Sequence, residues 1–142
     1  MLTLEVRGMG PSVRLQKGQL MAARDMISIV DDDPSMRDML VSLIRSLGYD
    51  ARAFASAEEF LASDDFESFA CAITDIHMPG MNGFELKERL DECRASLPVI
   101  MITARSEPEL REKAMSSGAA CFLRKPFDTE TLVCCLEKAL GA

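Results

Sequence analysis

The segment from Cys71 to Gly83 constrains the fold of this chain more than any other stretch. It begins with the run Cys-Ala-Ile-Thr, which is typical of a buried strand in a parallel sheet. Four turn-forming residues come soon afterwards: Pro79, Gly80, Asn82 and Gly83. Asp75 therefore lies where a buried strand gives way to a loop, and this edge of an open α/β sheet is where ligands bind. Taken alone, an Asp at such a point is more often a turn cap than a site of chemistry.

The rest of the chain alternates short apolar runs with helical patterns. Strands are predicted at residues 26–30, 49–54, 70–74, 99–103 and 119–123. Helices are predicted at residues 34–47, 56–61, 84–93, 106–118 and 128–140. Five such units predict an α/β fold, in which helices cover both faces of a parallel sheet through right-handed crossovers. We expect a doubly wound, flavodoxin-like three-layer sandwich, (βα)5, with the strand order 2-1-3-4-5.

Polar residues predict where several of these helices begin. Asp33 and Asp128 each precede a helical pattern and are predicted to be N-caps. Two segments have the pattern of a capping box, residues 56–59 and residues 106–109. Gly48 is predicted to end the first helix.

Length and charge limit the kind of protein. A chain of 142 residues predicts one domain, which we place at residues 26–142. Residues 1–25 lack a periodic apolar face and are predicted to be an N-terminal extension. No apolar run reaches the roughly 18 residues of a membrane span, and the N-terminus lacks a signal peptide's apolar core, so we expect a cytoplasmic protein without a membrane partner. A net charge of −7 argues against direct binding of nucleic acid.

The five cysteines predict neither a disulfide framework nor a zinc site. Their number is odd, no C-x-x-C pair occurs, and the chain has a single His. Most of them fall in apolar segments, which predicts reduced cysteines in the core of a cytosolic protein.

Three acidic residues are predicted to meet at the carboxyl edge of the sheet. In the order 2-1-3-4-5 the first and third strands are neighbours, so Asp31 and Asp32 approach Asp75. Like charges at such distances repel each other and call for a cation. Carboxylate oxygens suit Mg²⁺, which also attracts phosphoryl groups, and the sequence therefore predicts a magnesium site.

Two further strand ends supply a hydroxyl and a cation. Thr103 ends the fourth predicted strand, and Lys125 follows the fifth. Separately, they would be an ordinary β-branched strand residue and a solvated surface charge. Together with Asp75 and a metal, they are what phosphoryl transfer to a carboxylate requires, because its catalysis consists of positioning and charge neutralisation.

The same residues resemble the receiver domain of bacterial two-component response regulators, a family to which CheY belongs. The resemblance covers about residues 26–140 and rests on four motifs, which are Val30-Asp31-Asp32, Asp75 to Gly83, Thr103-Ala104 and Lys125-Pro126-Phe127. The segment Ser56 to Leu61 is further similar to receivers of the FixJ type.

The resemblance implies a chemical role for each residue of the acidic edge. Asp75 would accept a phosphoryl group from a phosphohistidine on a sensor histidine kinase or a phosphotransfer protein. Asp32 and Asp75 would bind Mg²⁺ together with the backbone carbonyl of His77, and Asp31 would act through a water molecule. Lys125 would pair with the phosphoryl group, and its peptide bond to Pro126 would be cis.

The resemblance also implies a switch. Thr103 would hydrogen-bond the phosphoryl group, and Phe122 would turn inward at the position where the family often has Tyr. The surface of residues 106–140, on the fourth helix, fifth strand and fifth helix, would then bind a downstream protein or a second copy. FixJ-like proteins usually carry a DNA-binding module after the receiver, so this chain would be a stand-alone regulator or a fragment.

Three other functions fit the sequence less well. A phosphatase of the haloacid dehalogenase type needs a second Asp two residues after the nucleophile, where this chain has His77. A flavodoxin-like cofactor binder must cradle a phosphate in its first loop, which the acidic residues 31–33 would repel. A module that is never phosphorylated has no reason to keep mutually repelling carboxylates. We therefore expect a switch that catalyses only its own phosphorylation and dephosphorylation, and not an enzyme acting on other substrates.

Overall fold

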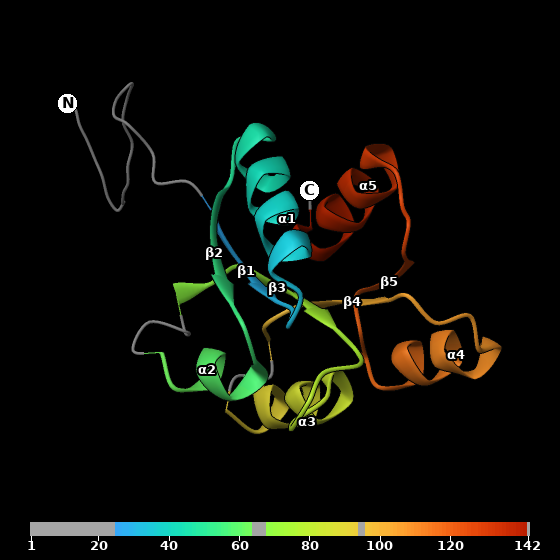
Figure 1. Ribbon diagram of the computed structural model, residues 1–142. Coiled ribbons are helices and arrows are strands. Elements are labelled where there is room, and N and C mark those ends of the chain that lie inside the picture. Colours follow the sequence, from blue (N-terminus) through green and yellow to red (C-terminus); the bar gives the residue numbers. More distant parts are fainter. Residues whose placement is uncertain (1–24, 64–67, 94–95, 142) are drawn as a thin grey trace.

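Five parallel strands form the single sheet of the computed structural model, which describes residues 25–63, 68–93 and 96–141. The strands are β1 (Met26–Val30), β2 (Asp50–Phe54), β3 (Cys71–Asp75), β4 (Val99–Thr103) and β5 (Cys121–Arg124). Their order is β2-β1-β3-β4-β5, and this confirms the predicted doubly wound topology (Figure 1). The predicted strand limits differ from these by at most two residues.

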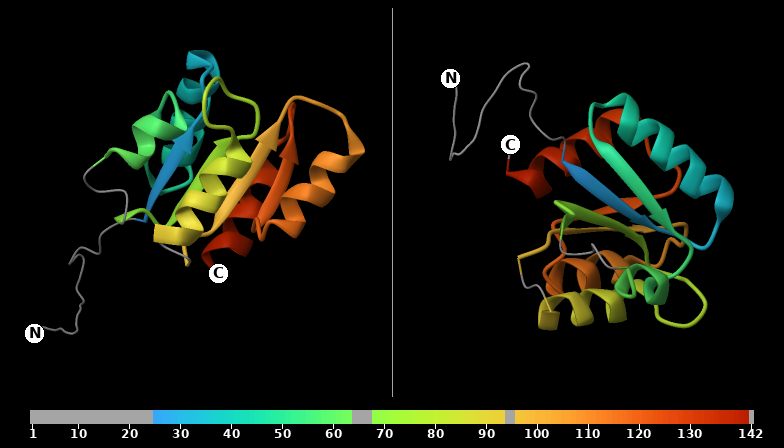
Figure 2. Two further views of the ribbon diagram at one scale, coloured as in Figure 1. Left: turned by 90° about the horizontal axis from the view of Figure 1, so that it is seen from below. Right: turned by 90° about the vertical axis from the view of Figure 1, so that its left-hand side faces the viewer.

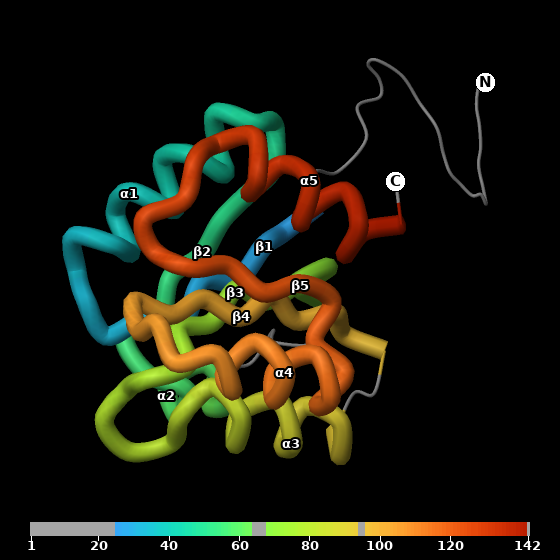
Figure 3. The backbone as a smooth tube through the Cα atoms, turned by 90° about the vertical axis from the view of Figure 1, so that its right-hand side faces the viewer, coloured from blue at the N-terminus to red at the C-terminus, as the bar shows by residue number. Residues whose placement is uncertain are grey.

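Within the residues that the structure describes, five helices cover the sheet in two layers. They are α1 (Pro34–Ser46), α2 (Ala57–Leu61), α3 (Gly83–Cys93), α4 (Pro108–Ser116) and α5 (Thr129–Leu140). Helices α1 and α5 lie on one face, and α2, α3 and α4 lie on the other (Figures 2 and 3). The expected three-layer sandwich is therefore confirmed.

Each face of the sheet has its own apolar core, because side chains alternate along a strand. Ile27, Ile29 and Ile73 belong to the core beneath α1 and α5. Val30 and Met101 belong to the core beneath the other three helices. All residues of β3 and β4 are buried, which is typical of the central strands of a parallel sheet. No helix in the described part of the chain is long and apolar enough to cross a membrane.

Most of the predicted helix starts are confirmed. Asp33 accepts the backbone N–H of Ser35 at 2.9 Å, and Asp128 accepts that of Thr131 at 2.8 Å. Ser56 likewise accepts the backbone N–H of Glu59 at 3.0 Å. The predicted capping box at residues 106–109 is wrong: Glu107 is the N-cap of α4 and makes no side-chain cap bond. Pro108 begins this helix instead, because its fixed φ and missing N–H suit the first turn.

The cysteine prediction is wrong for one pair. Cys121 of β5 and Cys135 of α5 form a disulfide, with Cα atoms 5.7 Å apart. Their spacing of 14 residues gave no sign of this, because the contact arises only when α5 packs back against β5. Of the other three, only Cys71 is a reduced core residue, and burial raises the pKa of its thiol to about 12. Cys93 and Cys134 are free and exposed.

Gly83 lets the loop after β3 close tightly onto the strand. A Cβ atom at this position would lie 2.7 Å from the backbone oxygen of Asp75 and 2.9 Å from the Cα of Ile76. The N–H of Gly83 also donates to the carbonyl oxygen of Ile76 at 2.8 Å. The glycine is thus required by close backbone approach beside the acidic edge.

Gly83→Ala is expected to destabilise the domain by about 1–3 kcal/mol, because the added methyl group must displace backbone atoms. Urea unfolding measures this. Gly141→Ala, whose added Cβ meets nothing within 4 Å but whose φ of +74° disfavours a side chain, measures the cost of backbone strain without a clash. Equal stabilities of the Gly83→Ala variant and the original protein would contradict the close approach.

Candidate functional site

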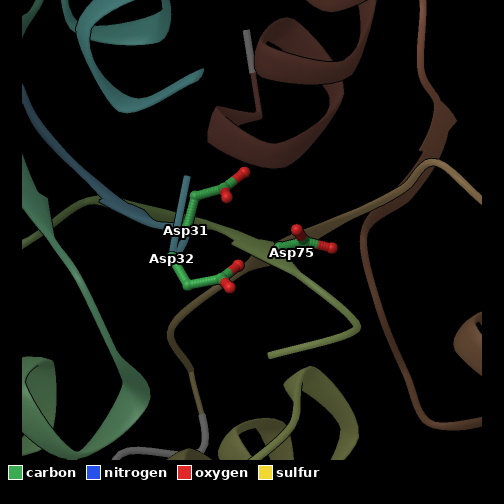
Figure 4. Close-up of side chains that lie close together, drawn as sticks. All are labelled: Asp31, Asp32 and Asp75. Atoms are coloured by element: carbon green, nitrogen blue, oxygen red, sulfur yellow. The ribbon is translucent and has the colours of Figure 1, made fainter. Parts of the chain in front are cut away.

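Three carboxylates lie together at the carboxyl edge of the sheet. Val30 pairs with Thr74 in the parallel ladder, so the residues that follow them lie side by side. One oxygen from each of Asp31, Asp32 and Asp75 lies within 4.8 Å of the other two (Figure 4). Asp31 and Asp75 are 1% and 8% exposed, whereas Asp32 is open to solvent. The predicted meeting of these three residues is therefore observed.

Lys125 lies between the two buried carboxylates. Its Nζ donates to Oδ2 of Asp31 at 3.1 Å and to Oδ2 of Asp75 at 3.2 Å. Burial raises the pKa of Asp75, and the negative charge of Asp31 adds to this, while Lys125 opposes it. Burial alone would lower the pKa of Lys125, but the charges of Asp75 and Asp31 outweigh it and the pKa is raised. The site thus keeps its ammonium charged beside a carboxylate whose ionisation is disfavoured. The bond between Lys125 and Pro126 is cis, as the family resemblance implied.

Backbone groups hold the carboxylates and the strand ends in place. The N–H of Asp33 donates to Oδ1 of Asp31 at 2.9 Å, and that of His77 donates to Oδ1 of Asp75 at 3.2 Å. Backbone bonds also continue beyond the strands. They are Asp31 N–H to Phe54 O at 3.1 Å, Ile76 N–H to Ile102 O at 2.8 Å and Lys125 N–H to Thr103 O at 2.8 Å. The acidic edge therefore has a hydrogen-bonded backbone frame.

Thr103 has two neighbours at its hydroxyl. The side chain is fully buried, and Oγ1 accepts the backbone N–H of Arg105 at 3.0 Å. Nδ1 of His77 lies 3.2 Å from the same oxygen. The family resemblance assigned only a backbone carbonyl to His77, so its ring contact with Thr103 was missed. No sequence signal points to it, because the two residues are 26 positions apart.

Two other contacts near the site were also missed by sequence reasoning. Oε2 of Glu58, at the start of α2, accepts the backbone N–H of Met81 at 3.0 Å and so holds the loop after β3. Asn82 and Glu85 cap α3 reciprocally, since each side chain accepts the other's backbone N–H at 2.9 Å. The second contact could have been found, because residues 82–85 have the spacing of a capping box.

Phe122 lies apart from the carboxylates, on β5. Its ring is buried, with 6% of the residue exposed, and the guanidinium carbon of Arg111 lies 5.1 Å from the ring centroid. Both residues line a cleft of about 570 Å³ between α4 and β5, which Lys125 also borders. The cleft therefore extends from Lys125 to the predicted switch aromatic.

The acidic residues fit a magnesium ion. Mg²⁺ forms bonds of about 2.1 Å to oxygen, so opposite ligands are about 4.2 Å apart. Neighbouring ligands are closer, at about 3.0 Å. One oxygen from each of Asp32 and Asp75 lies within 4.8 Å of the other, so side-chain movements would bring both to one ion, and Asp31 is near enough to act through a water ligand. The exposure of Asp32 leaves room for the water ligands that Mg²⁺ retains.

Asp75→Asn is expected to raise the melting temperature in buffer without divalent metal. Because the folded state raises the pKa of Asp75, ionising this group costs folding free energy. The cost is absent below the unfolded pKa of about 3.9 and fully present above the folded pKa. A neutral amide removes it at pH 7, by an amount on the order of 1 kcal/mol, or roughly 4 °C.

Calorimetry in EDTA measures this shift. The matched control is Asp38→Asn, which removes a carboxylate from the exposed side of α1 and is expected to leave the melting temperature nearly unchanged. A lower melting temperature for Asp75→Asn would mean that the pairing with Lys125 outweighs the burial of the charge.

The sequence is similar to known signalling proteins over most of its length. The family described as response regulator receiver domain matches residues 27–137. The transcriptional regulatory protein FixJ of Bradyrhizobium diazoefficiens is 35% identical over 120 residues, which are 84% of this chain and 58% of FixJ. The response regulator protein TodT of Pseudomonas putida is 35% identical over 115 residues, which are 81% of this chain and 51% of TodT. The chain thus spans about half the length of the curated relatives it matches.

Solved structures show the same architecture. The chemotaxis protein CheY4 of Vibrio cholerae superimposes with a TM-score of 0.76 at 32% identity, over 83% of this chain and 100% of CheY4. The structure named FixJ-N superimposes with a TM-score of 0.76 at 30% identity, over 84% of this chain and 96% of FixJ-N.

Three observations agree on the family. The strand order is that of CheY-like proteins, an acidic cluster lies at the carboxyl edge of the sheet, and the family match covers most of the chain. Members of this family are signalling switches and not classical enzymes. The chain belongs to the response regulator receiver domains, the phosphorylation-activated switches of two-component systems.

Proposed function

We propose that Asp75 is the residue that accepts the phosphoryl group. The observation that carries this proposal is the position of its carboxylate, at the sheet edge beside two other acids and within hydrogen-bond distance of Lys125. The donor is a phosphohistidine on a sensor histidine kinase or a phosphotransfer protein. An oxygen of Asp75 forms a bond to phosphorus while the bond from phosphorus to the imidazole nitrogen breaks. The leaving nitrogen keeps the electron pair and takes up a proton, and Asp75 becomes an acyl phosphate.

The residues around Asp75 neutralise the charge that collects there. Asp32, Asp75 and the backbone carbonyl of His77 would hold Mg²⁺, with Asp31 acting through a water molecule. The ion would supply positive charge to the phosphoryl oxygens. The ammonium of Lys125, already charged in this environment, would move from the carboxylates to a phosphoryl oxygen. The chain would catalyse only two reactions: the transfer of the phosphoryl group to its own Asp75 and the later hydrolysis of that acyl phosphate.

Phosphorylation would act on the α4–β5–α5 surface through Thr103 and Phe122. The Thr103 hydroxyl would move toward the phosphoryl oxygens, which are strong acceptors. Phe122 would use the space that this movement vacates, and its ring is already buried in the unphosphorylated chain. The surface of residues 106–140 would then bind a downstream protein or a second copy of the chain.

Residues 26–142 would form the receiver unit and residues 1–25 an extension, although only residues 25–63, 68–93 and 96–141 are described by the structure. The charge of −7 supports partners that are proteins and not nucleic acid. With a histidine kinase as donor, the chain would act in the cytoplasm.

Acetyl phosphate tests the proposal without knowledge of the kinase. In the presence of Mg²⁺ the protein is expected to gain one phosphoryl group, seen by intact-mass spectrometry. NMR chemical-shift changes are expected to extend from the loops of the acidic edge to residues 106–140. Changes confined to the loops around Asp31, Asp75 and Lys125 would contradict the proposed switch surface, and absence of labelling would contradict the phosphoryl transfer.

A further inference from the structure

We propose that the imidazole of His77 holds the hydroxyl of Thr103 in the unphosphorylated protein and competes with the phosphoryl group for it. His77 is then a positioning residue of the switch, acting through Thr103. This inference rests on the proposed function, in which Thr103 binds the phosphoryl group on Asp75.

The contact joins the loop after β3 to the end of β4. Nδ1 of His77 lies 3.2 Å from Oγ1 of Thr103. The backbone N–H of His77 donates to Oδ1 of Asp75, which keeps the residue beside the acceptor carboxylate. Thr103 is fully buried, so solvent does not compete freely for its hydroxyl. The ring of His77 therefore contacts the same group that the phosphoryl oxygens need.

The hydroxyl of Thr103 has a limited hydrogen-bonding capacity. It offers one proton and two acceptor lone pairs. Its oxygen already accepts the backbone N–H of Arg105 at 3.0 Å. In the tautomer that carries its proton on Nε2, the Nδ1 atom of His77 is an acceptor and receives the hydroxyl proton. A phosphoryl oxygen is also only an acceptor, so it requires the same proton.

We assign this tautomer to His77, and in it phosphorylation must break the bond between His77 and Thr103, because the single hydroxyl proton cannot be donated to both acceptors. The favourable free energy of binding the phosphoryl group is therefore reduced by the net free energy of the bond between His77 and Thr103. A net contribution typical of a protein hydrogen bond corresponds to a change of about 2- to 10-fold in an equilibrium constant. Removing the acceptor on residue 77 should strengthen the binding of a phosphoryl analogue by this factor.

Two substitutions separate the hydrogen bond from the size of the ring. His77→Phe keeps an aromatic ring but has no acceptor, whereas His77→Asn places an amide group near the position of Nδ1. The probe is beryllofluoride, an analogue of the phosphoryl group, titrated into the Mg²⁺-containing protein and followed by NMR. His77→Phe is expected to bind it about 2- to 10-fold more tightly, and His77→Asn is expected to restore the original affinity.

Thr103→Val tests whether His77 acts through the hydroxyl. In this background His77→Phe should have no effect on beryllofluoride affinity, because the shared proton is gone. Since His77 is the only His of the chain, its imidazole nitrogen resonances are unambiguous. The Nδ1 resonance should move when beryllofluoride binds. In the unliganded Thr103→Val variant it should already be shifted in the same direction.

Three results would overturn the inference: unchanged affinity in His77→Phe, equal tightening in His77→Phe and His77→Asn, or a His77→Phe effect that persists with Val at position 103. Failure of the proposed function would look different, because the original protein would then bind no beryllofluoride and take no label from acetyl phosphate. In that case the imidazole spectra of the unliganded protein and its Thr103→Val variant still decide whether His77 holds the hydroxyl.

Discussion

Asp75→Asn is expected to abolish labelling by acetyl phosphate. An amide cannot form the acyl phosphate, because its nitrogen and oxygen lack the nucleophilic charge of a carboxylate. The fold should persist, since Asn has nearly the same shape and its oxygen can still accept the backbone N–H of His77. Intact-mass spectrometry after incubation with Mg²⁺ and acetyl phosphate should show no gain in mass, whereas the original protein gains one phosphoryl group.

Asp128→Asn is the matched control for this experiment. Asp128 is exposed and caps α5, so its replacement changes the same functional group away from the acidic edge. This variant should be labelled as well as the original protein. Full labelling of Asp75→Asn would assign the acceptor role to another carboxylate, of which Asp31 and Asp32 are the nearest.

Removal of Mg²⁺ should reduce the labelling rate by more than about 100-fold. A bound metal contributes several kcal/mol to the stabilisation of charge in phosphoryl transfer, and each 1.4 kcal/mol is about a factor of ten. Without the ion, three carboxylates face an incoming group that is itself negative, and Lys125 pairs with only two of them. Labelling in excess EDTA, compared with labelling in millimolar Mg²⁺, measures the effect.

The same ion should stabilise the fold, because it binds the native chain and not the unfolded one. At a concentration 100 times its dissociation constant, a ligand adds about 2.7 kcal/mol to the free energy of unfolding. Asp32→Asn should weaken this stabilisation, while Asp38→Asn, on the exposed side of α1, should leave it unchanged. Identical melting temperatures in EDTA and in Mg²⁺ would show that the acidic edge holds no magnesium.

The sequence predicted the elements whose causes are local or periodic. Short apolar runs between helical patterns predicted the positions of all five strands that the structure describes. The order of the strands within the sheet followed from the general rules of α/β folds. Asp33 and Asp128 were recognised as caps because capping depends on the few residues that follow. The meeting of Asp31, Asp32 and Asp75 was also predictable, because it requires only that β1 and β3 be neighbours.

Contacts between distant side chains could not be predicted in this way. The disulfide between Cys121 and Cys135 depends on how α5 packs against β5. The approach of His77 to Thr103 depends on the path of the loop after β3, which Glu58 and Gly83 help to fix. Such contacts are set by tertiary packing, and the residue pattern of one segment does not show which distant side chain it will contact.

The hydrogen-bonded frame at the acidic edge has a consequence for the pace of signalling. Backbone bonds continue past the ends of β1, β3 and β5 to carbonyl groups of β2 and β4, so the frame can stay intact while Thr103 and Phe122 turn. Rotation of side chains is fast, and collective rearrangements around it take microseconds to milliseconds. Because no part of the sheet has to unfold, the conformational change can keep pace with phosphorylation and dephosphorylation. The duration of each signal should then be the lifetime of the acyl phosphate, and the amide protons of this frame should exchange slowly in both states.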